Sequence, residues 1–205
     1  MLLLYRAPWS TNVERVALVL AHKGIEVESL VIDYADRSAV EAVSGQGLVP
    51  VIDDDGHVVS DSNAIIRYLE ERRPDPPLFP AEPARRAELD VFLDWFDRVW
   101  KGPPNEIEAE LAKPAPDEAR IADLSALMDD RLDLFEQMLD GRDHLLGPAF
   151  SAADCVAFPF LKYARGREAE DTEAFHVVLD EHQSVSGRPR LAAWIERVDA
   201  RPRAY

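Results

Sequence analysis

The spacing of apolar residues divides the first 73 positions into short strands and longer helices. Apolar runs or alternating residues over four to seven positions predict strands, and apolar residues three or four apart predict helices. The expected order is strand 2–5, helix 10–23, strand 26–32, a short helix or turn at 37–43, strands 50–53 and 57–60 around a turn at Asp55-Gly56, and helix 62–73. This β-α-β-α-β-β-α order, with a parallel part and an antiparallel hairpin, predicts a thioredoxin-like domain.

The second half of the chain shows only the helical spacing. A proline-rich linker at 74–80 precedes it, and helices are expected over 83–110, 117–140, 151–165, 171–181 and 191–200. The predicted fold class is therefore an α+β thioredoxin-like domain at 1–76, followed by an all-α helical domain at 83–205.

Charge and cysteine content narrow the functional classes. The chain has 39 acidic and 23 basic residues, a net charge of −16, which argues against nucleic acid or an anionic membrane as a partner. The single cysteine, Cys155, cannot form an internal disulfide, and this favours a reducing compartment. No apolar run approaches the ~20 residues of a membrane span, and the first residues lack the features of a signal peptide. A cytoplasmic location is expected.

Two neighbouring segments offer a site for a peptide. Pro50 stands at the start of a predicted strand, a position that suits a residue without a backbone N–H. If the Val49–Pro50 bond is cis, the backbone of Val49 turns out of the sheet and can pair with an extended ligand. Asp61 and Ser62 begin the next helix, where free N–H groups and the positive dipole end favour a carboxylate. A backbone clamp would thus lie beside a pocket for an amino-acid terminus.

Two serines are expected to begin helices. Ser10 would be the N-cap of the first helix, and a plain capping role is worth ~1 kcal/mol. Ser151 and Asp154 form a capping box, with Phe150 and Cys155 placed as its hydrophobic staple. We interpret this box as structural, and Cys155 as a core residue.

In their order and spacing, five segments resemble the glutathione transferase superfamily, of the serine/cysteine type or the nu-like class of bacterial type. They are 5–10, 48–52, 60–65, 151–154 and 189–195, and the resemblance covers nearly the whole chain. It implies an enzyme that uses glutathione as co-substrate on a small electrophile, without a metal, and that forms a homodimer. The five histidines likewise show no paired metal spacing.

The resemblance also implies roles for particular residues. Ser10 would donate a hydrogen bond to the sulfur of glutathione and favour the thiolate, which attacks the electrophile. Asp61 would meet the ammonium of the γ-glutamyl end and Ser62 its carboxylate. The backbone of Val49 would pair with the cysteinyl part, so that the predicted glutathione contacts are Leu48, Val49, Pro50, Asp61 and Ser62.

Several positions depart from the family pattern or allow alternatives. Leu48 stands where a lysine or glutamine often binds the glycyl carboxylate, and Arg37 is the basic residue nearest to it. Asp61 replaces the commoner glutamate. Asn12 is either a second donor to sulfur, as in nu-like disulfide reductases, or a solvated residue of the first turn. Tyr5 is a rival to Ser10, although an ordinary strand aromatic is the better interpretation.

The electrophile would bind between the two domains, at residues that the resemblance also suggests. These are Arg6, Trp9, Asn12 and Trp100. Trp100 could equally be a core or subunit-interface residue, because aromatic residues at helical spacing usually are. Three other functions stay open: a nu-like disulfide reductase, a glutathione-dependent isomerase, and a non-catalytic binding module of the same fold.

Overall fold

The computed structural model describes all 205 residues. They form two compact units, one of Met1–Pro80 with Arg201–Tyr205 and one of Ala81–Ala200. The first unit is built on a four-stranded mixed sheet and the second is entirely helical. The predicted fold class, a thioredoxin-like domain followed by an all-α domain, is confirmed.

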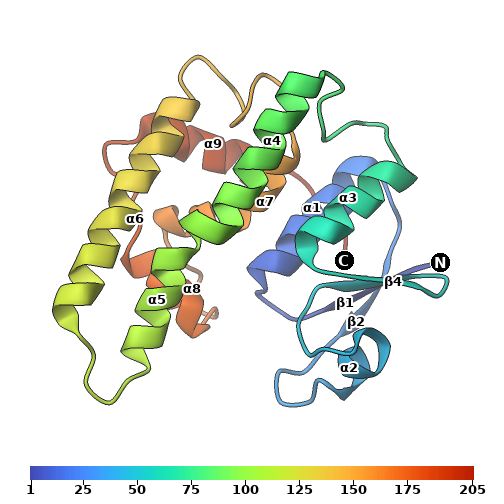
Figure 1. Ribbon diagram of the computed structural model, residues 1–205, viewed down its shortest axis with the longest axis horizontal. Coiled ribbons are helices and arrows are strands. Elements are labelled where there is room, and N and C mark those ends of the chain that lie inside the picture. Colours follow the sequence, from blue (N-terminus) through green and yellow to red (C-terminus); the bar gives the residue numbers. More distant parts are fainter. The chain divides into compact units, whose positions relative to one another are not determined.

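The sheet of the first unit has the order β2-β1-β3-β4. Strand β1 pairs in parallel with β2 and antiparallel with β3, which pairs antiparallel with β4. Helices α1 and α3 cover one face of the sheet and α2 the other (Figure 1). The elements are β1 Leu2–Arg6, α1 Thr11–Lys23, β2 Glu28–Val31, α2 Ser38–Ser44, β3 Val51–Asp54, β4 His57–Ser60 and α3 Ser62–Arg72.

Alternation along β1 gives the sheet a core on both faces. Leu4 is fully buried, and Tyr5, on the opposite face, packs with Ile32, Val40 and Val51. Tyr5 is therefore the ordinary strand aromatic that the sequence favoured. Helix α1 ends at Gly24, whose φ of 58° is the left-handed conformation of a helix C-terminus.

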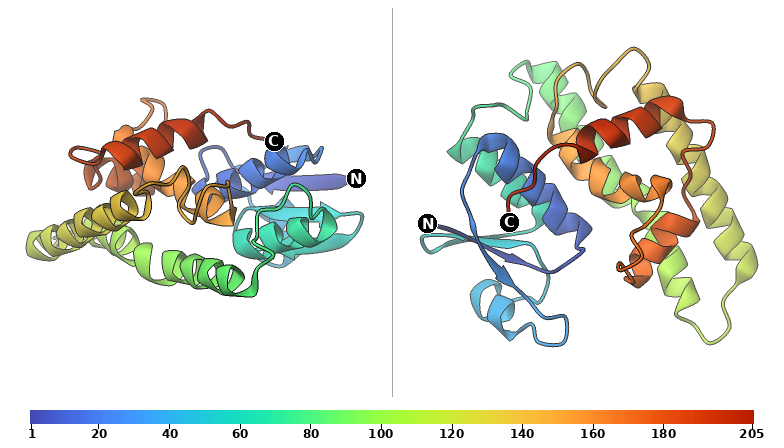
Figure 2. Two further views of the ribbon diagram at one scale, coloured as in Figure 1. Left: turned by 90° about the horizontal axis from the view of Figure 1, so that it is seen from above. Right: turned by 180° about the vertical axis from the view of Figure 1, so that it is seen from behind.

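The last five residues fold back onto α1. The Ala204 N–H donates to the Ala17 carbonyl at 3.1 Å, and Arg203 Nη2 forms an ion pair with Glu14 Oε1 at 2.9 Å. The end of the chain lies beside α1 when the molecule is seen from behind (Figure 2, right). The sequence placed these residues in the helical domain at 83–205, because nothing local distinguishes them from the helix before them.

In the second unit, the predicted helix at 83–110 is divided. A π-helical turn, η1, follows α4, and its Lys101 N–H donates to the Phe96 carbonyl at 3.1 Å. Pro103 and Pro104 then begin α5, since they lack the N–H groups that a continuing helix needs. The elements are α4 Pro83–Trp95, η1 Phe96–Trp100, α5 Gly102–Leu111, α6 Glu118–Met138, α7 Ala152–Leu161, η2 Lys162–Arg165, α8 Ala174–Glu181 and α9 Pro189–Asp199. None of the helices combines the length and hydrophobicity that a membrane crossing requires.

The predicted capping box at the start of α7 is present, and its carboxylate also accepts hydrogen bonds from the preceding loop and from α9. Asp154 is fully buried, and its Oδ2 accepts the Ser151 N–H at 2.9 Å. Its Oδ1 accepts the Leu145 N–H at 3.1 Å and the Trp194 Nε1–H at 2.8 Å. One carboxylate thus joins α7, the loop before it and α9.

Replacing this carboxylate should destabilise the protein more than an ordinary cap does. Asp154→Ala leaves the buried donors of Leu145 and Trp194 without acceptors, at ~1–3 kcal/mol each, besides the ~1 kcal/mol of the cap. We expect the free energy of unfolding in urea to fall by about 3 kcal/mol or more. Asp117→Ala, which removes the exposed cap of α6, is the matched control and should cost ~1 kcal/mol. Equal losses in the two variants would contradict the central role of Asp154.

Candidate functional site

Three strand ends lie side by side at one edge of the sheet. Tyr5 of β1 pairs with Val51 of β3, and Val51 pairs with Ser60 of β4. The chain leaves β1 for Ser10, enters β3 from Val49-Pro50 and leaves β4 for Asp61, all at this edge. The register therefore brings together the three segments that hold most of the predicted site residues.

Ser10 is the N-cap of α1. Its φ and ψ are −61° and 113°, and its Oγ accepts the Val13 N–H at 3.3 Å. Ser10 thus caps the helix, and this role is compatible with the predicted donation of a hydrogen bond to sulfur. A hydroxyl that accepts a hydrogen bond keeps its own proton to donate. Asn12 lies half-buried in the first turn of α1. This position is compatible with a second donor to sulfur and with a partly solvated residue of the helix.

The segment before β3 has the backbone geometry that the sequence predicted. The Val49–Pro50 bond is cis, which confirms that prediction. Strand pairing begins at Val51, so Val49 lies outside the ladder. The side chain of Leu48 is 71% exposed. Arg37 Nη1 donates to the Gly47 carbonyl at 2.6 Å, and this places a guanidinium beside the loop that carries Leu48.

Asp61 and Ser62 stand at the start of α3. Asp61 is exposed, and its Oδ1 accepts the Ala64 N–H at 3.0 Å as the N-cap. Ser62 is buried, and its Oγ accepts a hydrogen bond from Arg15 Nη1 at 3.2 Å. Since Arg15 follows Ser10 on α1, this bond ties the first turns of α1 to the N-terminus of α3.

Backbone strain marks two of the predicted site residues. Three residues other than glycine have positive φ: Trp9 at 61°, Asp55 at 52° and Asp61 at 76°. Asp55 lies in the hairpin turn, where aspartate tolerates this conformation. Trp9 directly precedes Ser10, and Asp61 directly precedes Ser62. Such conformations cost ~1–3 kcal/mol each and cluster at functional sites, so their position independently favours a site here.

The residues suggested for the electrophile differ in their surroundings. The Arg6 guanidinium lies 4.9 Å from the ring centroid of Tyr205, and Trp9 is exposed. Trp100 is only 1% exposed and stacks on Phe96 with ring centroids 4.5 Å apart. Trp100 is thus a core residue of the helical unit, as the alternative interpretation of its helical spacing held, and it is not part of the candidate site.

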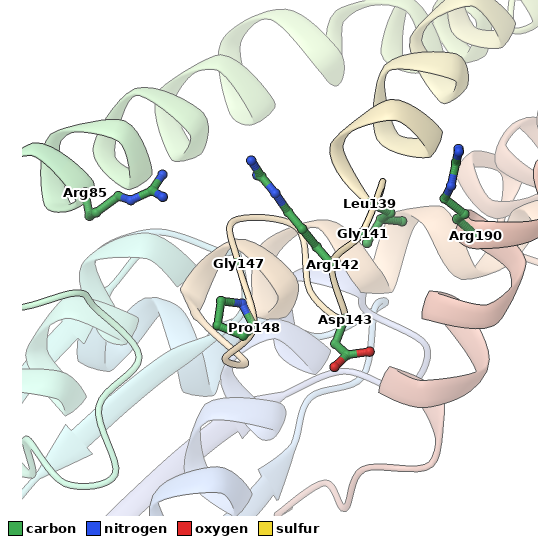
Figure 3. Close-up of a pocket in the computed structure, with 8 residues that line it drawn as sticks. All are labelled: Arg85, Leu139, Gly141, Arg142, Asp143, Gly147, Pro148 and Arg190. Carbon is green, nitrogen blue, oxygen red and sulfur yellow. The ribbon is translucent and has the colours of Figure 1, made fainter.

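A separate pocket of about 700 Å³ lies within the helical unit and contains none of the predicted residues. Two of its arginines are already paired, Arg85 with Glu88 at 2.6 Å and Arg190 with Glu136 at 3.2 Å. Figure 3 shows the eight lining residues: Arg85, Leu139, Gly141, Arg142, Asp143, Gly147, Pro148 and Arg190. The pocket is therefore not part of the candidate site. The structure contains no group of three or more His, Cys, Asp or Glu side chains that could hold a metal ion.

The residue that sequence reasoning missed is Arg15. It is fully buried on α1 among apolar neighbours such as Val13 and Val16. The signal was a charged residue within an otherwise apolar helix segment, where a buried charge requires a partner. Its partner, Ser62, is distant in sequence, so the pair could not be recognised before the fold was known.

A thioredoxin-like unit followed by a helical unit, with these segments at one sheet edge, defines the fold of a glutathione transferase. Residues 4–77 match the glutathione S-transferase N-terminal domain and residues 81–197 its C-terminal domain. The chain belongs to the glutathione transferase superfamily.

Individual relatives are similar to the chain at low identity. Glutathione S-transferase F10 of Arabidopsis thaliana is 25% identical over 98% of this chain and 94% of its own length. FtsZ-localized protein A of Caulobacter vibrioides is 28% identical over 75% of this chain and 73% of its own. Among solved structures, the theta class glutathione S-transferase of Xanthomonas axonopodis pv. citri, with glutathione bound, has a TM-score of 0.75 and 25% identity, and the match covers 98% of this chain and 93% of that chain.

The strain at Asp61 predicts an unusual order of stabilities. Asp61→Gly removes the cap but suits a φ of 76°, whereas Asp61→Ala removes the cap and keeps the strain. We expect the free energy of unfolding of the alanine variant to be lower than that of the glycine variant by about 1 kcal/mol or more. Urea denaturation measures both. At Glu82, the cap of α4 with a φ of −73°, glycine and alanine should differ by less, and the same difference at both caps would contradict the strain.

Proposed function

We propose that this protein binds glutathione and activates its thiol for attack on a small electrophile. The observation that carries the proposal is the register Tyr5–Val51–Ser60. It directs the segments with Ser10, Val49 and Asp61 to one sheet edge. Glutathione is a short peptide with a thiol, an amino-acid terminus and a second carboxylate. These segments offer partners to the thiol and to the amino-acid terminus, and Arg37 offers one to the second carboxylate.

The peptide would bind through backbone and charge. Val49, outside the strand ladder, pairs its backbone with the cysteinyl residue. Asp61 uses only Oδ1 as a cap, so Oδ2 meets the γ-glutamyl ammonium. The Ser62 hydroxyl and the N–H groups of α3 receive the γ-glutamyl carboxylate. Arg37, beside Gly47, takes the glycyl carboxylate in place of Leu48.

The thiol would be activated at the N-terminus of α1. Ser10 Oγ donates its hydrogen to the sulfur, and the positive end of the helix dipole adds to this stabilisation of the thiolate. In comparable surroundings a thiol pKa falls from ~8.5 into the range of about 3.5–7.5. The thiolate then supplies the electron pair that forms a bond to the electrophile. The electrophile would lie near Arg6, Trp9 and Asn12.

Removing the Ser10 hydroxyl should affect the rate and leave binding nearly unchanged. A hydrogen bond to a charged group is worth ~1.5–3 kcal/mol, so turnover of an activated aromatic halide by Ser10→Ala should fall by roughly one to two decades. The pH at which the bound thiol ionises should rise, because the thiolate loses a donor. The pH–rate profile and the glutathione Kd measure both effects.

Two further variants distinguish the classes of enzyme. If Asn12→Ala lowers turnover while Ser10→Ala does not, and if a model disulfide is a better substrate than the halide, the protein is a nu-like disulfide reductase. If only Tyr5→Phe lowers turnover, the tyrosine is the sulfur ligand. Turnover of an isomerisable substrate without consumption of glutathione would indicate an isomerase.

A non-catalytic binding module is the second candidate, favoured by the similarity to FtsZ-localized protein A. A thermal-shift titration with glutathione separates the two. A ligand at 100 times its Kd adds ~2.7 kcal/mol of stability, so the midpoint should rise if glutathione binds. No shift at millimolar glutathione would favour the binding module.

We expect the protein to be a cytoplasmic homodimer, as the family resemblance implies. Large apolar side chains are exposed on two helices of the second unit, Val91 on α4 and Leu127 and Leu134 on α6, and such side chains are common at subunit contacts. Light scattering of the purified protein measures the oligomeric state.

A further inference from the structure

The guanidinium of Arg6 has no acidic partner. Arg6 is the last residue of β1 and is half-buried, and its Nε is buried without a hydrogen-bond partner. Its charge contacts the ring of Tyr205, with Cζ 4.9 Å from the ring centroid, and none of the ion pairs in the structure includes it. An aromatic ring stabilises a cation but offers no acceptor in the plane of its N–H groups. A buried donor without an acceptor is costly and rare, so it calls for a partner outside the chain.

Other arginines of the first unit show the usual arrangement. Arg72 forms an ion pair with Asp54 at 2.8 Å, and Arg73 Nη1 donates to the Gly24 carbonyl at 2.8 Å. The chain has 39 acidic residues and a net charge of −16, so carboxylates are abundant. That none of them pairs with Arg6 is therefore a feature of this position and not of the composition.

Arg6 lies beside the segment that carries Ser10. Because Tyr5 faces the core under α2, alternation along β1 turns Arg6 to the face that α1 covers. The end of the chain runs along α1 (Figure 2, right), and the charge of Glu14 acts on Tyr205. Glu14 follows Ser10 by one helical turn, and its N–H donates to the Ser10 carbonyl at 3.0 Å. The Arg6–Tyr205 contact thus stands at the start of α1, within the first unit alone.

The charges around this contact leave one cation over. Arg203 donates from Nε and Nη2 to Glu14 Oε1 at 3.1 and 2.9 Å, so these two charges compensate each other. Burial raises the pKa of Tyr205, and the Glu14 carboxylate raises it further. The phenol is therefore neutral at pH 7 and supplies Arg6 with no counter-charge. The planar fork of a guanidinium matches a carboxylate, which it can bind through two parallel hydrogen bonds.

We propose that Arg6 binds an anionic group of the electrophile and that Tyr205 is a positioning residue for its guanidinium. The inference rests on the proposed function, in which the glutathione thiolate forms beside Ser10. It adds a statement on substrate class: electrophiles that carry a carboxylate are preferred over neutral molecules of the same shape. Arg6 binds the substrate and takes no part in the bonds that form and break.

A pair of aromatic halides of one shape tests this preference. One is para-chlorodinitrobenzoate, with both nitro groups ortho to chlorine, and the other is its neutral primary amide. In both, the glutathione sulfur forms a bond to the ring carbon that carries chlorine, and chloride leaves with its electron pair. Each kcat/KM, measured at saturating glutathione, is divided by the rate constant of the uncatalysed reaction. The ratio of benzoate to benzamide should fall by about 10-fold to 100-fold in Arg6→Met, mainly through the KM for the benzoate.

Matched variants separate a local contact from overall charge. Arg72→Met removes one positive charge at the opposite end of the sheet, where Asp54 pairs with Leu2, and should leave the ratio within about twofold, since exposed charges are screened beyond ~10 Å. Arg6→Lys keeps the charge without the fork and should give an intermediate ratio, also should Arg6→Met fail to fold. Tyr205→Leu should lower the ratio by about threefold, and Tyr205→Phe, which keeps the ring, should restore it.

The outcomes separate the two proposals. If the wild type turns over neither halide with glutathione, the proposed activation of the thiol is wrong and the role of Arg6 falls with it. If the wild type uses both halides and Arg6→Met lowers both equally, or if Arg72→Met lowers the ratio as much, the inference alone is overturned. A fall in the ratio that is confined to the variants of Arg6 and to Tyr205→Leu supports it.

Discussion

The alignment of Tyr5, Val51 and Ser60 across three strands is the constraint on which the site depends. Side chains alternate along a strand, so a shift of one residue in either pairing would turn the core residues of that strand to the wrong face. The same shift would move one connecting segment along the sheet edge by about 3.3 Å. The packing of Leu4, Tyr5 and Val51 in the core therefore also sets where the loops to Ser10 and Asp61 begin. Stability and site geometry share one set of contacts.

Local capping chemistry was the part of the structure that the sequence predicted best. The capping bonds of Ser10 with Val13 and of Asp154 with Ser151 each span three residues, so composition and spacing reveal them. The cis bond at Val49–Pro50 was predicted from a strand-start proline and the family resemblance together. Element order followed from hydrophobic period. The helix predicted at 83–110 is instead interrupted by the π-helical turn Phe96–Trp100 and by the new helix start at Pro103 and Pro104, which remove backbone donors.

Contacts between distant residues were not predictable. Arg15 and Ser62 are 47 positions apart, Trp194 and Asp154 are 40 apart, and Arg203 and Glu14 are 189 apart. Each is a polar contact in which one partner has no local signal that names the other. Positive φ at Trp9 was equally hidden, because a tryptophan gives no hint of the left-handed region. These features are tertiary in origin, and they are also the ones that refine the candidate site.

The return of the last residues to α1 has a consequence for how the protein is made. Synthesis proceeds from the N-terminus, so the sheet and its helices leave the ribosome well before Arg203 and Ala204. These two residues contact Glu14 and Ala17 of α1, respectively. The first unit therefore cannot complete its own contacts until the entire helical unit has been translated. In topological terms the helical unit is an insertion within the first, and a protease that removed the last five residues would act on the unit that begins the chain.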